Sequence, residues 1–118
     1  MLSGENLAAI RTIDLTTRGR RTGRQRTVEI WWFHVDGRFI ISGTPGRRDW
    51  LANVRSDPRV IIGANGHEIE ATAEEVTDPG FRRRFFTDSK TSWYSSQSEL
   101  ERLIESAPMI EVNLPTTR

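Results

Sequence analysis

The chain has 118 residues, 36% of them hydrophobic and 28% charged, and this composition is typical of one globular domain spanning residues 1–118. The absence of cysteine excludes disulfides, iron–sulfur clusters and thiol nucleophiles, and it fits a cytoplasmic location. The longest apolar run, residues 30–33, is too short to span a bilayer, so we expect no stable membrane insertion. Because the net charge is only +1, attraction for an anion must come from clustered charges.

The N-terminal third of the sequence predicts strands joined by short turns. A short helix is expected over residues 5–10 and a strand over residues 11–17. A loop rich in arginine and glycine follows. Residues 25–35, rich in β-branched and aromatic side chains, predict one long strand. The next two residues are Asp-Gly, a strong hairpin signal, so residues 38–42 are expected to return antiparallel to that strand.

The middle of the sequence predicts a helix and a second hairpin. The helix is expected over residues 47–56, because Thr44 suits an N-cap and Pro45 suits a first helical position. Strands over residues 59–64 and 67–76 flank an Asn-Gly turn. In the second of these strands the glutamates share one face and the apolar residues share the other.

The last forty residues predict two helices and a closing strand. Asp78 and Pro79 open the first helix, and Ser96 with Glu99 forms a capping box for the second. Residues 109–114 alternate between apolar and polar side chains, and this pattern predicts the closing strand. Many antiparallel strands with short connections predict a mainly β (α+β) fold, a small antiparallel barrel with two or three short helices.

The loop between the first two strands is the strongest candidate for a binding site. Five arginines fall within nine positions and interleave with glycines. These arginines are Arg18, Arg20, Arg21, Arg24 and Arg26. Guanidinium groups match phosphate and carboxylate, and glycines bring backbone N–H groups close to a ligand. The loop is therefore either an anion site or a solvated hairpin tip kept basic against aggregation.

Two further segments suggest contacts with a ligand. The segment from Thr44 to Arg48 would present free N–H groups and positive charge if Thr44 caps a helix, although an ordinary helix start explains it equally well. The aromatic residues 31–33 alternate between two faces of one strand, so both faces need covering. Trp93 and Tyr94 lie in a polar segment expected to be a linker, where exposed aromatics suit a lid over an apolar pocket.

Other kinds of catalytic site lack support in the sequence. His34 and His67 match no metal-binding spacing, so no metal is expected. No serine lies in a nucleophile elbow, and no carboxylate pair suits acid–base work, so the catalytic residues are unknown. An enzyme without an evident nucleophile, metal or acid–base pair usually takes its chemistry from a bound cofactor.

Residues 11–77 resemble the deazaflavin (F420)-dependent nitroreductase family, whose members resemble the flavin-binding split β-barrels. The family pattern T-T-x-G-R-K-x-G-x-x-R is matched by Thr16, Thr17, Gly19, Arg20, Arg21, Gly23 and Arg26. Its W-x-x-N-L-x-x-x-P helix end is represented here by Trp50, Asn53, Val54 and Pro58. The resemblance implies a small antiparallel split β-barrel that transfers a hydride from the reduced cofactor F420H2 to a small conjugated acceptor, such as a quinone, an enone or a nitro compound.

The resemblance also implies site residues and partners. Arg20, Arg21 and Arg26 would hold the phosphate or the oligoglutamate tail of F420. The other cofactor contacts would be Thr22, Ser42, Gly43, Thr44, Gly46, Arg47 and Trp50, and the substrate contacts would be Trp93 and Tyr94. Split barrels often dimerise, so a homodimer is expected, with a small-molecule acceptor as the other partner.

The sequence departs from the family pattern in the loop at residues 43–46. Gly-Thr-Pro-Gly stands there in place of Ser-Lys-Gly-Gly, so Pro45 removes a backbone donor and a lysine is lost. FMN as the cofactor, or a non-catalytic cofactor-binding protein, therefore stays an alternative. A nucleic-acid module that uses the basic hairpin is a distant alternative. The near-neutral charge argues against that module, so no nucleic-acid partner is expected.

Overall fold

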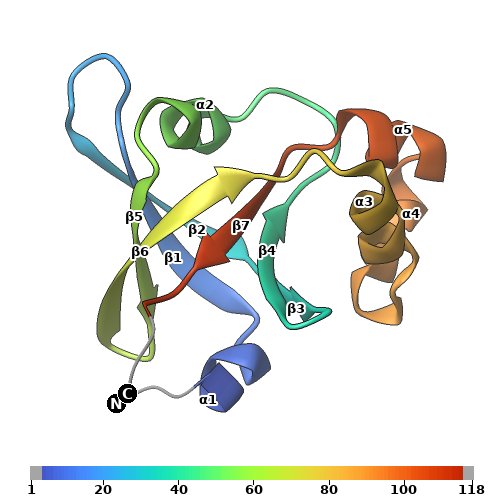
Figure 1. Cartoon of the computed structure of the whole chain (residues 1–118), viewed down its shortest axis with the longest axis horizontal. Helices are drawn as coiled ribbons and strands as arrows, with labels where there is room; N and C mark the ends of the chain where they lie inside the picture. Colours follow the sequence, from blue (N-terminus) through green and yellow to red (C-terminus); the bar gives the residue numbers. More distant parts are fainter. Residues whose placement is uncertain (1–3, 116–118) are drawn as a thin grey trace.

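The computed structural model describes residues 4–115, which form one seven-stranded antiparallel sheet and five short α-helices (Figure 1). The strands are β1 (Thr12–Arg18), β2 (Gln25–Trp31), β3 (Phe33–Val35), β4 (Arg38–Ser42), β5 (Arg59–Ala64), β6 (His67–Glu75) and β7 (Met109–Asn113). The α-helices are α1 (Gly4–Ala9), α2 (Asp49–Ser56), α3 (Pro79–Thr87), α4 (Ser92–Gln97) and α5 (Leu100–Ser106), and Ser89–Thr91 forms a 3-10 turn. The predicted mainly β class is confirmed, with more helices than the two or three expected.

The sheet curls into a partly closed barrel because its two edge strands are neighbours in the chain. The strand order is β2-β1-β5-β6-β7-β4-β3, so β2 and β3 lie at opposite edges. Only Trp32 separates these two strands in the sequence. A chain that leaves one edge and immediately joins the other must bring the edges together. The prediction of one continuous strand over residues 25–35 is therefore wrong at a single residue, and that break closes the barrel.

Trp32 fixes this break through both polar and apolar contacts. Its backbone N–H donates to the carbonyl of Arg11 at 2.9 Å, and its indole N–H donates to the carbonyl of Ile10 at 2.9 Å. Its ring stacks on Phe39 with centroids 4.5 Å apart, and the residue is only 2% exposed. The chain therefore changes strands at a residue whose donors are both satisfied inside the core.

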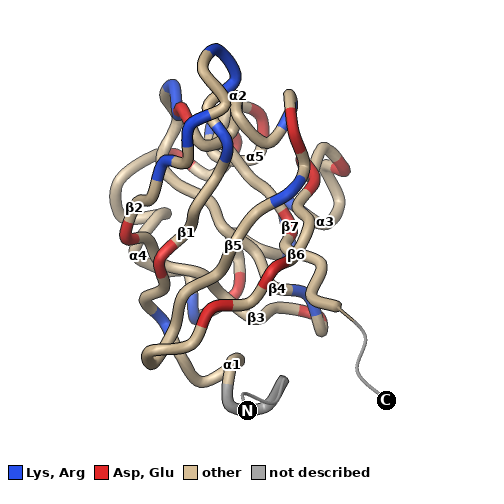
Figure 2. Tube along the Cα trace, turned by 90° about the vertical axis from the view of Figure 1, so that its left-hand side faces the viewer, with Lys and Arg blue, Asp and Glu red and all other residues tan. Residues whose placement is uncertain are grey.

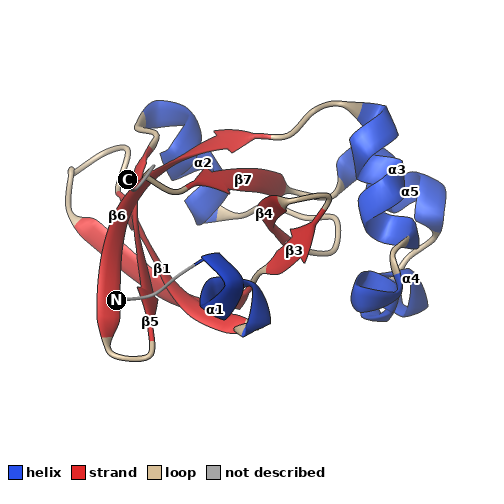
Figure 3. Ribbon diagram, turned by 60° about the horizontal axis from the view of Figure 1, so that its bottom comes forward, coloured by secondary structure: helices blue, strands red, loops and turns tan. Residues whose placement is uncertain are grey.

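Two hydrophobic cores lie on opposite faces of the sheet. One fills the barrel and includes Leu15, Ile41, Ile62 and Trp32. The other lies between the outward face of β3, β4 and β7 and the helices α3, α4 and α5, which gather on one side of the sheet (Figure 3). The expected alternation of residues 31–33 is confirmed, because Trp32 enters the first core and Phe33 enters the second.

The predicted start of the helix over residues 47–56 is wrong. The helix α2 begins at Asp49, and its N-cap residue is Arg48, whose side chain makes no capping bond. Thr44 does not cap the helix, because its carbonyl accepts a hydrogen bond from the Arg48 guanidinium at 3.0 Å. Gly46 has a φ of 146°, a conformation that only glycine adopts without strain, and it keeps residues 44–47 out of the helix.

The expected linker around Trp93 and the capping box at Ser96 are also wrong. Residues 92–97 form the helix α4, and Ser96 lies inside it with its hydroxyl donating to the carbonyl of Trp93. Glu99 is the N-cap residue of α5, without a side-chain capping bond. In contrast, the predicted cap of α3 is confirmed, because the Asp78 carboxylate accepts from the backbone N–H of Phe81.

The helices α3 and α5 are joined by a buried arginine, Arg82, which is 7% exposed. Its guanidinium donates to carbonyl oxygens on three segments around it. The acceptors are the carbonyls of Val76 (2.8 Å), Leu103 (3.3 Å), Ile104 (2.6 Å) and Ala107 (2.5 Å). Three of these carbonyls lie in the last turn of α5 or at its C-cap, where helix carbonyls run out of intrahelical donors, and that of Leu103 also accepts from the backbone N–H of Ala107. Within residues 4–115, no helix is both long and apolar enough to cross a lipid bilayer.

We predict that Arg82→Met lowers the free energy of unfolding by about 3 kcal/mol, since a buried charge and its hydrogen bonds are lost together. Urea denaturation of the purified protein measures the change. Arg102→Met is the matched control, because Arg102 is exposed on α5, and it is expected to change the stability by less than about 0.5 kcal/mol. Equal stability of the two variants would contradict this role for Arg82.

Candidate functional site

The basic loop between β1 and β2 is a tight turn held by its own backbone. The N–H of Gly19 donates to the carbonyl of Arg24 at 2.7 Å, and the N–H of Gly23 donates to the carbonyl of Gly19 at 2.8 Å. Gly23 has a φ of 72°, which favours glycine. Figure 2 shows the loop tip as one of the most basic parts of the trace.

A buried amide fastens this loop to α2. The side-chain oxygen of Asn53 accepts from the backbone N–H of Arg20 at 3.2 Å and from its guanidinium at 2.9 Å. The amide nitrogen of Asn53 donates to the hydroxyl of Thr17 at 3.0 Å. Asn53 and Thr17 are each 2% exposed. We name these contacts of Asn53 with Arg20 and Thr17 the Asn53 latch.

The space between the loop and α2 is a groove of about 690 Å³, named here the hairpin groove. Its lining comprises Thr17, Gly19, Arg20, Arg21, Thr22, Gln25, Arg26, Thr27, Val28, Asp49, Trp50 and Asn53. Five predicted cofactor contacts are thus brought together: Arg20, Arg21, Thr22, Arg26 and Trp50. The groove combines a basic wall with the apolar side chains of Val28 and Trp50.

The arginines of the hairpin groove differ in their engagement. Arg20 is held by Asn53, and its guanidinium also lies 3.4 Å from the carboxylate of Asp49. Among the described residues, no ion pair involves Arg21 or Arg26. Within the described part of the chain, these two guanidinium groups therefore have no carboxylate partner, whereas Arg20 is held against α2.

The other predicted cofactor residues, in the loop between β4 and α2, lie outside the hairpin groove. Ser42 is buried, and its hydroxyl donates to the carbonyl of Pro108 at 2.6 Å. The Arg48 guanidinium folds back against Gly43, where an added Cβ would lie 2.9 Å from its Nη2. Thr44 contacts the same guanidinium through its carbonyl and hydroxyl.

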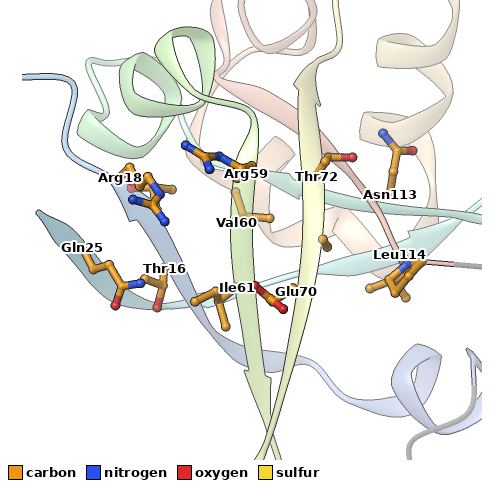
Figure 4. A pocket seen from close by; sticks show the side chains of 13 residues that line it. Thr16, Arg18, Gln25, Arg59, Val60, Ile61, Glu70, Thr72, Asn113 and Leu114 are labelled. Atoms are coloured by element: carbon orange, nitrogen blue, oxygen red, sulfur yellow. The ribbon is translucent and has the colours of Figure 1, made fainter. Parts of the chain in front are cut away.

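Gly46 and Arg47 line a second cleft of about 790 Å³ on another side of α2, together with acidic residues of α5. The two basic segments recognised in the sequence therefore flank α2, and they do not line one shared pocket. A third hollow, of about 630 Å³, lies on the outward face of β1, β5 and β6, where polar side chains such as Arg59 and Glu70 surround Ile61 (Figure 4). It contains none of the predicted site residues.

Trp93 and Tyr94 occupy different environments. Trp93 is 47% exposed and meets Trp31, itself 36% exposed, edge to face at 5.7 Å. Tyr94 is 4% exposed and packs among Phe33, Phe85 and other aromatic rings of the second core. Of Trp93 and Tyr94, only Trp93 is exposed, whereas the sequence predicted exposure for both.

The side chain of Tyr94 is almost fully buried, being 4% exposed. Burial raises the pKa of Tyr94 to about 12, against the lowering effect of the nearby charges of Arg11 and Arg48. The phenol accordingly keeps its proton throughout the neutral range.

Sequence reasoning missed the roles of three residues. Asn53 was recognised as part of a motif, but its function as a latch needed the distance to Arg20. A polar residue on the buried side of a helix, beside Trp50 and Val54, is the signal that could have revealed it. Arg11 carries no sequence signal, and Arg48 was recognised only as a positive charge of the segment that begins at Thr44. Among residues 4–115 there is no cluster of three or more potential metal ligands, and His34 and His67 lie on different strands.

Several solved structures share this fold. The conserved hypothetical protein Rv2991 from Mycobacterium tuberculosis superposes with a TM-score of 0.71 at 16% identity, covering 98% of this chain and 82% of that one. The structure described as F420-H2 dependent reductase (FDR-A) gives 0.64 at 17% identity, covering 86% and 93%. An FAD-binding protein (mll6688) from Mesorhizobium loti gives 0.64 at 18% identity, covering 93% and 85%.

The match to a family model is more specific than the similarity in fold. The family model described as F420H(2)-dependent quinone reductase matches residues 2–109, nearly the whole chain. The matched region contains the basic hairpin, the Asn53 latch and the aromatic residues of α4. The chain therefore belongs to the F420H2-dependent quinone reductase family and is an F420H2-dependent oxidoreductase.

Proposed function

We propose that the protein binds F420 in the hairpin groove and reduces a small conjugated acceptor, such as a quinone, an enone or a nitro compound, at the aromatic residues of β2 and α4. When bound, F420H2 supplies the hydride. The observation that carries the proposal is the pairing of two unengaged arginines, Arg21 and Arg26, with an apolar wall in one groove. The side chains of the protein would bind and orient the cofactor and the acceptor, and would supply a proton to the acceptor.

The charged end of F420 fits the basic wall of the groove. Its phosphodiester and oligoglutamate tail are anionic, and Arg21 and Arg26 have no carboxylate partner among the described residues. Each charge-assisted hydrogen bond to such an anion contributes roughly 1.5–3 kcal/mol. Thr22, at the same turn, adds a hydroxyl donor beside them. These residues would hold the tail.

The ring of F420 fits the apolar wall. Val28 lies on β2 and pairs in register with Leu15, a residue of the barrel core, yet Val28 is 40% exposed. An exposed valine on the inward face of an edge strand leaves apolar surface that a flat ring would cover. Trp50 lines the same groove. We propose that backbone groups of the loop at residues 43–46 complete the cofactor site, although they lie outside the hairpin groove.

Acceptor binding is assigned to Trp93 and Tyr94. The exposed face of Trp93 and the neighbouring Trp31 offer aromatic surface on which a flat acceptor would stack. The ring of Tyr94 lies next to that of Trp93, with centroids 5.3 Å apart. Tyr94 is protonated at neutral pH, so its hydroxyl would donate a hydrogen bond, and then the proton, to the oxygen of an acceptor that has received a hydride.

FMN is the second candidate for the cofactor. Its phosphate would suit the same arginines, one structurally similar protein is described as FAD-binding, and Pro45 removes a donor from the loop that the family pattern fills with Ser-Lys-Gly-Gly. A protein that binds F420 without turnover is the third candidate. Figure 2 argues against a nucleic-acid module, because acidic segments of β6 share the surface with the basic hairpin.

We propose a cytoplasmic homodimer as the working form. The outward face of β1, β5 and β6 is not covered by any described helix, and it carries cations and carboxylates side by side in the hollow shown in Figure 4. Such a face can pair with a copy of itself about a two-fold axis. The lack of cysteine suits a reducing compartment.

The cofactor assignment predicts the effect of removing both unengaged arginines. The double variant Arg21→Ala and Arg26→Ala should weaken F420 binding by about 100-fold, since each lost interaction is equivalent to about tenfold in affinity. Quenching of F420 fluorescence measures the dissociation constant. A parallel titration with FMN decides between the two cofactors.

The matched control is the double variant Arg24→Ala and Arg102→Ala. It removes the same charge from positions that do not line the hairpin groove. Its affinity for F420 should stay within about threefold of the wild type, as expected of screened surface charges. Equal losses in the two double variants would show that net charge, and not the groove, attracts the cofactor.

The proton-donor assignment predicts the effect of Tyr94→Phe. The substitution keeps the ring that packs in the second core, so the fold and the F420 affinity should stay unchanged. The turnover number for a quinone acceptor should fall by at least about tenfold at neutral pH, because the proton donor is lost. Steady-state kinetics with F420H2 measures it. A variant with wild-type turnover would remove Tyr94 from the reaction.

A further inference from the structure

Arg11 lies at the junction of α1 and β1 and stacks on aromatic rings. Its guanidinium carbon is 4.8 Å from the ring centroid of Trp31 and 5.6 Å from that of Phe33. A guanidinium that stacks on a ring face keeps its N–H groups free, because they point outward in its own plane. In the described part of the chain, no carboxylate forms an ion pair with Arg11.

A small cavity of about 210 Å³ opens beside this arginine. It is lined by Ala8, Ala9, Ile10, Arg11, Trp32, Phe33, His34 and Lys90. Its walls are mainly apolar, with His34 as a further polar side chain, and the two cations, Arg11 and Lys90, come from the position just before β1 and from the 3-10 turn after α3. Lys90 is positioned by its ammonium group, which donates to the carbonyl of His34 at 2.8 Å. No carboxylate side chain belongs to the lining.

The positive charge of this region extends towards the proposed acceptor site. Phe33 packs edge to face on Tyr94 with ring centroids 5.8 Å apart, so the cavity and the Tyr94 ring share one wall. Arg11 and Arg48 are the charged groups whose fields act on the Tyr94 hydroxyl, and both favour a negative charge there. Trp31 connects Arg11 to the exposed ring of Trp93.

We infer that the cavity between α1 and β3 is a carboxylate subsite, in which Arg11 and Lys90 bind the acidic group of a flat aromatic molecule whose ring lies on Trp31 and Trp93. Apolar walls disfavour a fully hydrated inorganic anion, while a guanidinium fork matches a planar carboxylate. The inference rests on the proposed function and narrows it. The preferred acceptor is a conjugated ring that carries an acidic substituent.

The test compares two ligands of the same shape and different charge, naphthoate and naphthamide. Nitrogen–proton NMR spectra of the tryptophan indoles report binding, and the N–H signals of Trp31 and Trp93 should shift while that of Trp50 does not. We expect naphthoate to bind at least about tenfold more tightly than naphthamide, as one charge-assisted contact predicts. The Arg11→Met variant should lose this preference, and Lys90→Met should reduce it.

Arg102→Met is the control, because it removes an exposed arginine that lines none of the clefts described above, and it should keep the preference. Arg11→Gln replaces Arg11→Met if the latter does not fold. Equal affinity for the two ligands in the wild type, or a preference that survives in Arg11→Met, would overturn the subsite.

An F420 titration on the same samples separates the subsite from the proposed function. If the protein binds F420 but does not prefer naphthoate to naphthamide, the subsite is overturned and the proposed function is not. A charge preference in a protein that binds no F420 supports the subsite and overturns the proposed function.

Discussion

The candidate site depends on one buried amide, Asn53, because it joins the basic loop to α2 through hydrogen bonds to both the backbone and the side chain of Arg20. A basic loop carries like charges that repel one another, and without an anchor it would occupy many conformations. The Asn53 latch binds the backbone and side chain of Arg20 and holds the loop against α2. The hairpin groove therefore has defined walls before a ligand enters it, so less conformational entropy is lost on binding.

A second constraint positions the aromatic residues. Since Trp32 carries the chain from one sheet edge to the other, its neighbours must point away from the barrel core. Phe33 is covered by α3 and α4, whereas Trp31 stays at the surface beside Trp93 and Arg11. The buried core residue thus determines where the exposed aromatic surface lies. The strand β2 carries both this aromatic surface, at Trp31, and one wall of the hairpin groove, at Val28. The proposed cofactor on the inward face of β2 and the proposed acceptor at the end of β2 would therefore contact the same strand.

Local signals in the sequence were sufficient for the strands, the hairpin turns and the cap of α3, because each depends on a few adjacent residues. They failed where distant residues decide. The start of α2 is determined by the Arg48 guanidinium that engages Thr44, and the helix α4 is stabilised by the packing of Tyr94 on Phe33 and Phe86. The arginine cluster was identified from the sequence. Which arginine is held against the protein and which has no carboxylate partner among the described residues depends on contacts with α2, such as the bond from Arg20 to Asn53, 33 positions away in the chain.

The most direct test of this account is a double-mutant cycle across Arg20 and Asn53, read as the affinity for F420. Arg20→Ala keeps the backbone N–H bond to Asn53, whereas Asn53→Ala removes the whole latch. If Arg20 acts only through the Asn53 latch, Asn53→Ala therefore weakens binding at least as much as Arg20→Ala, and the double variant binds no more weakly than Asn53→Ala alone. If the losses of the single variants multiply in the double variant, Arg20 binds the cofactor independently of Asn53, and the assignment of the latch as the support of the groove is wrong.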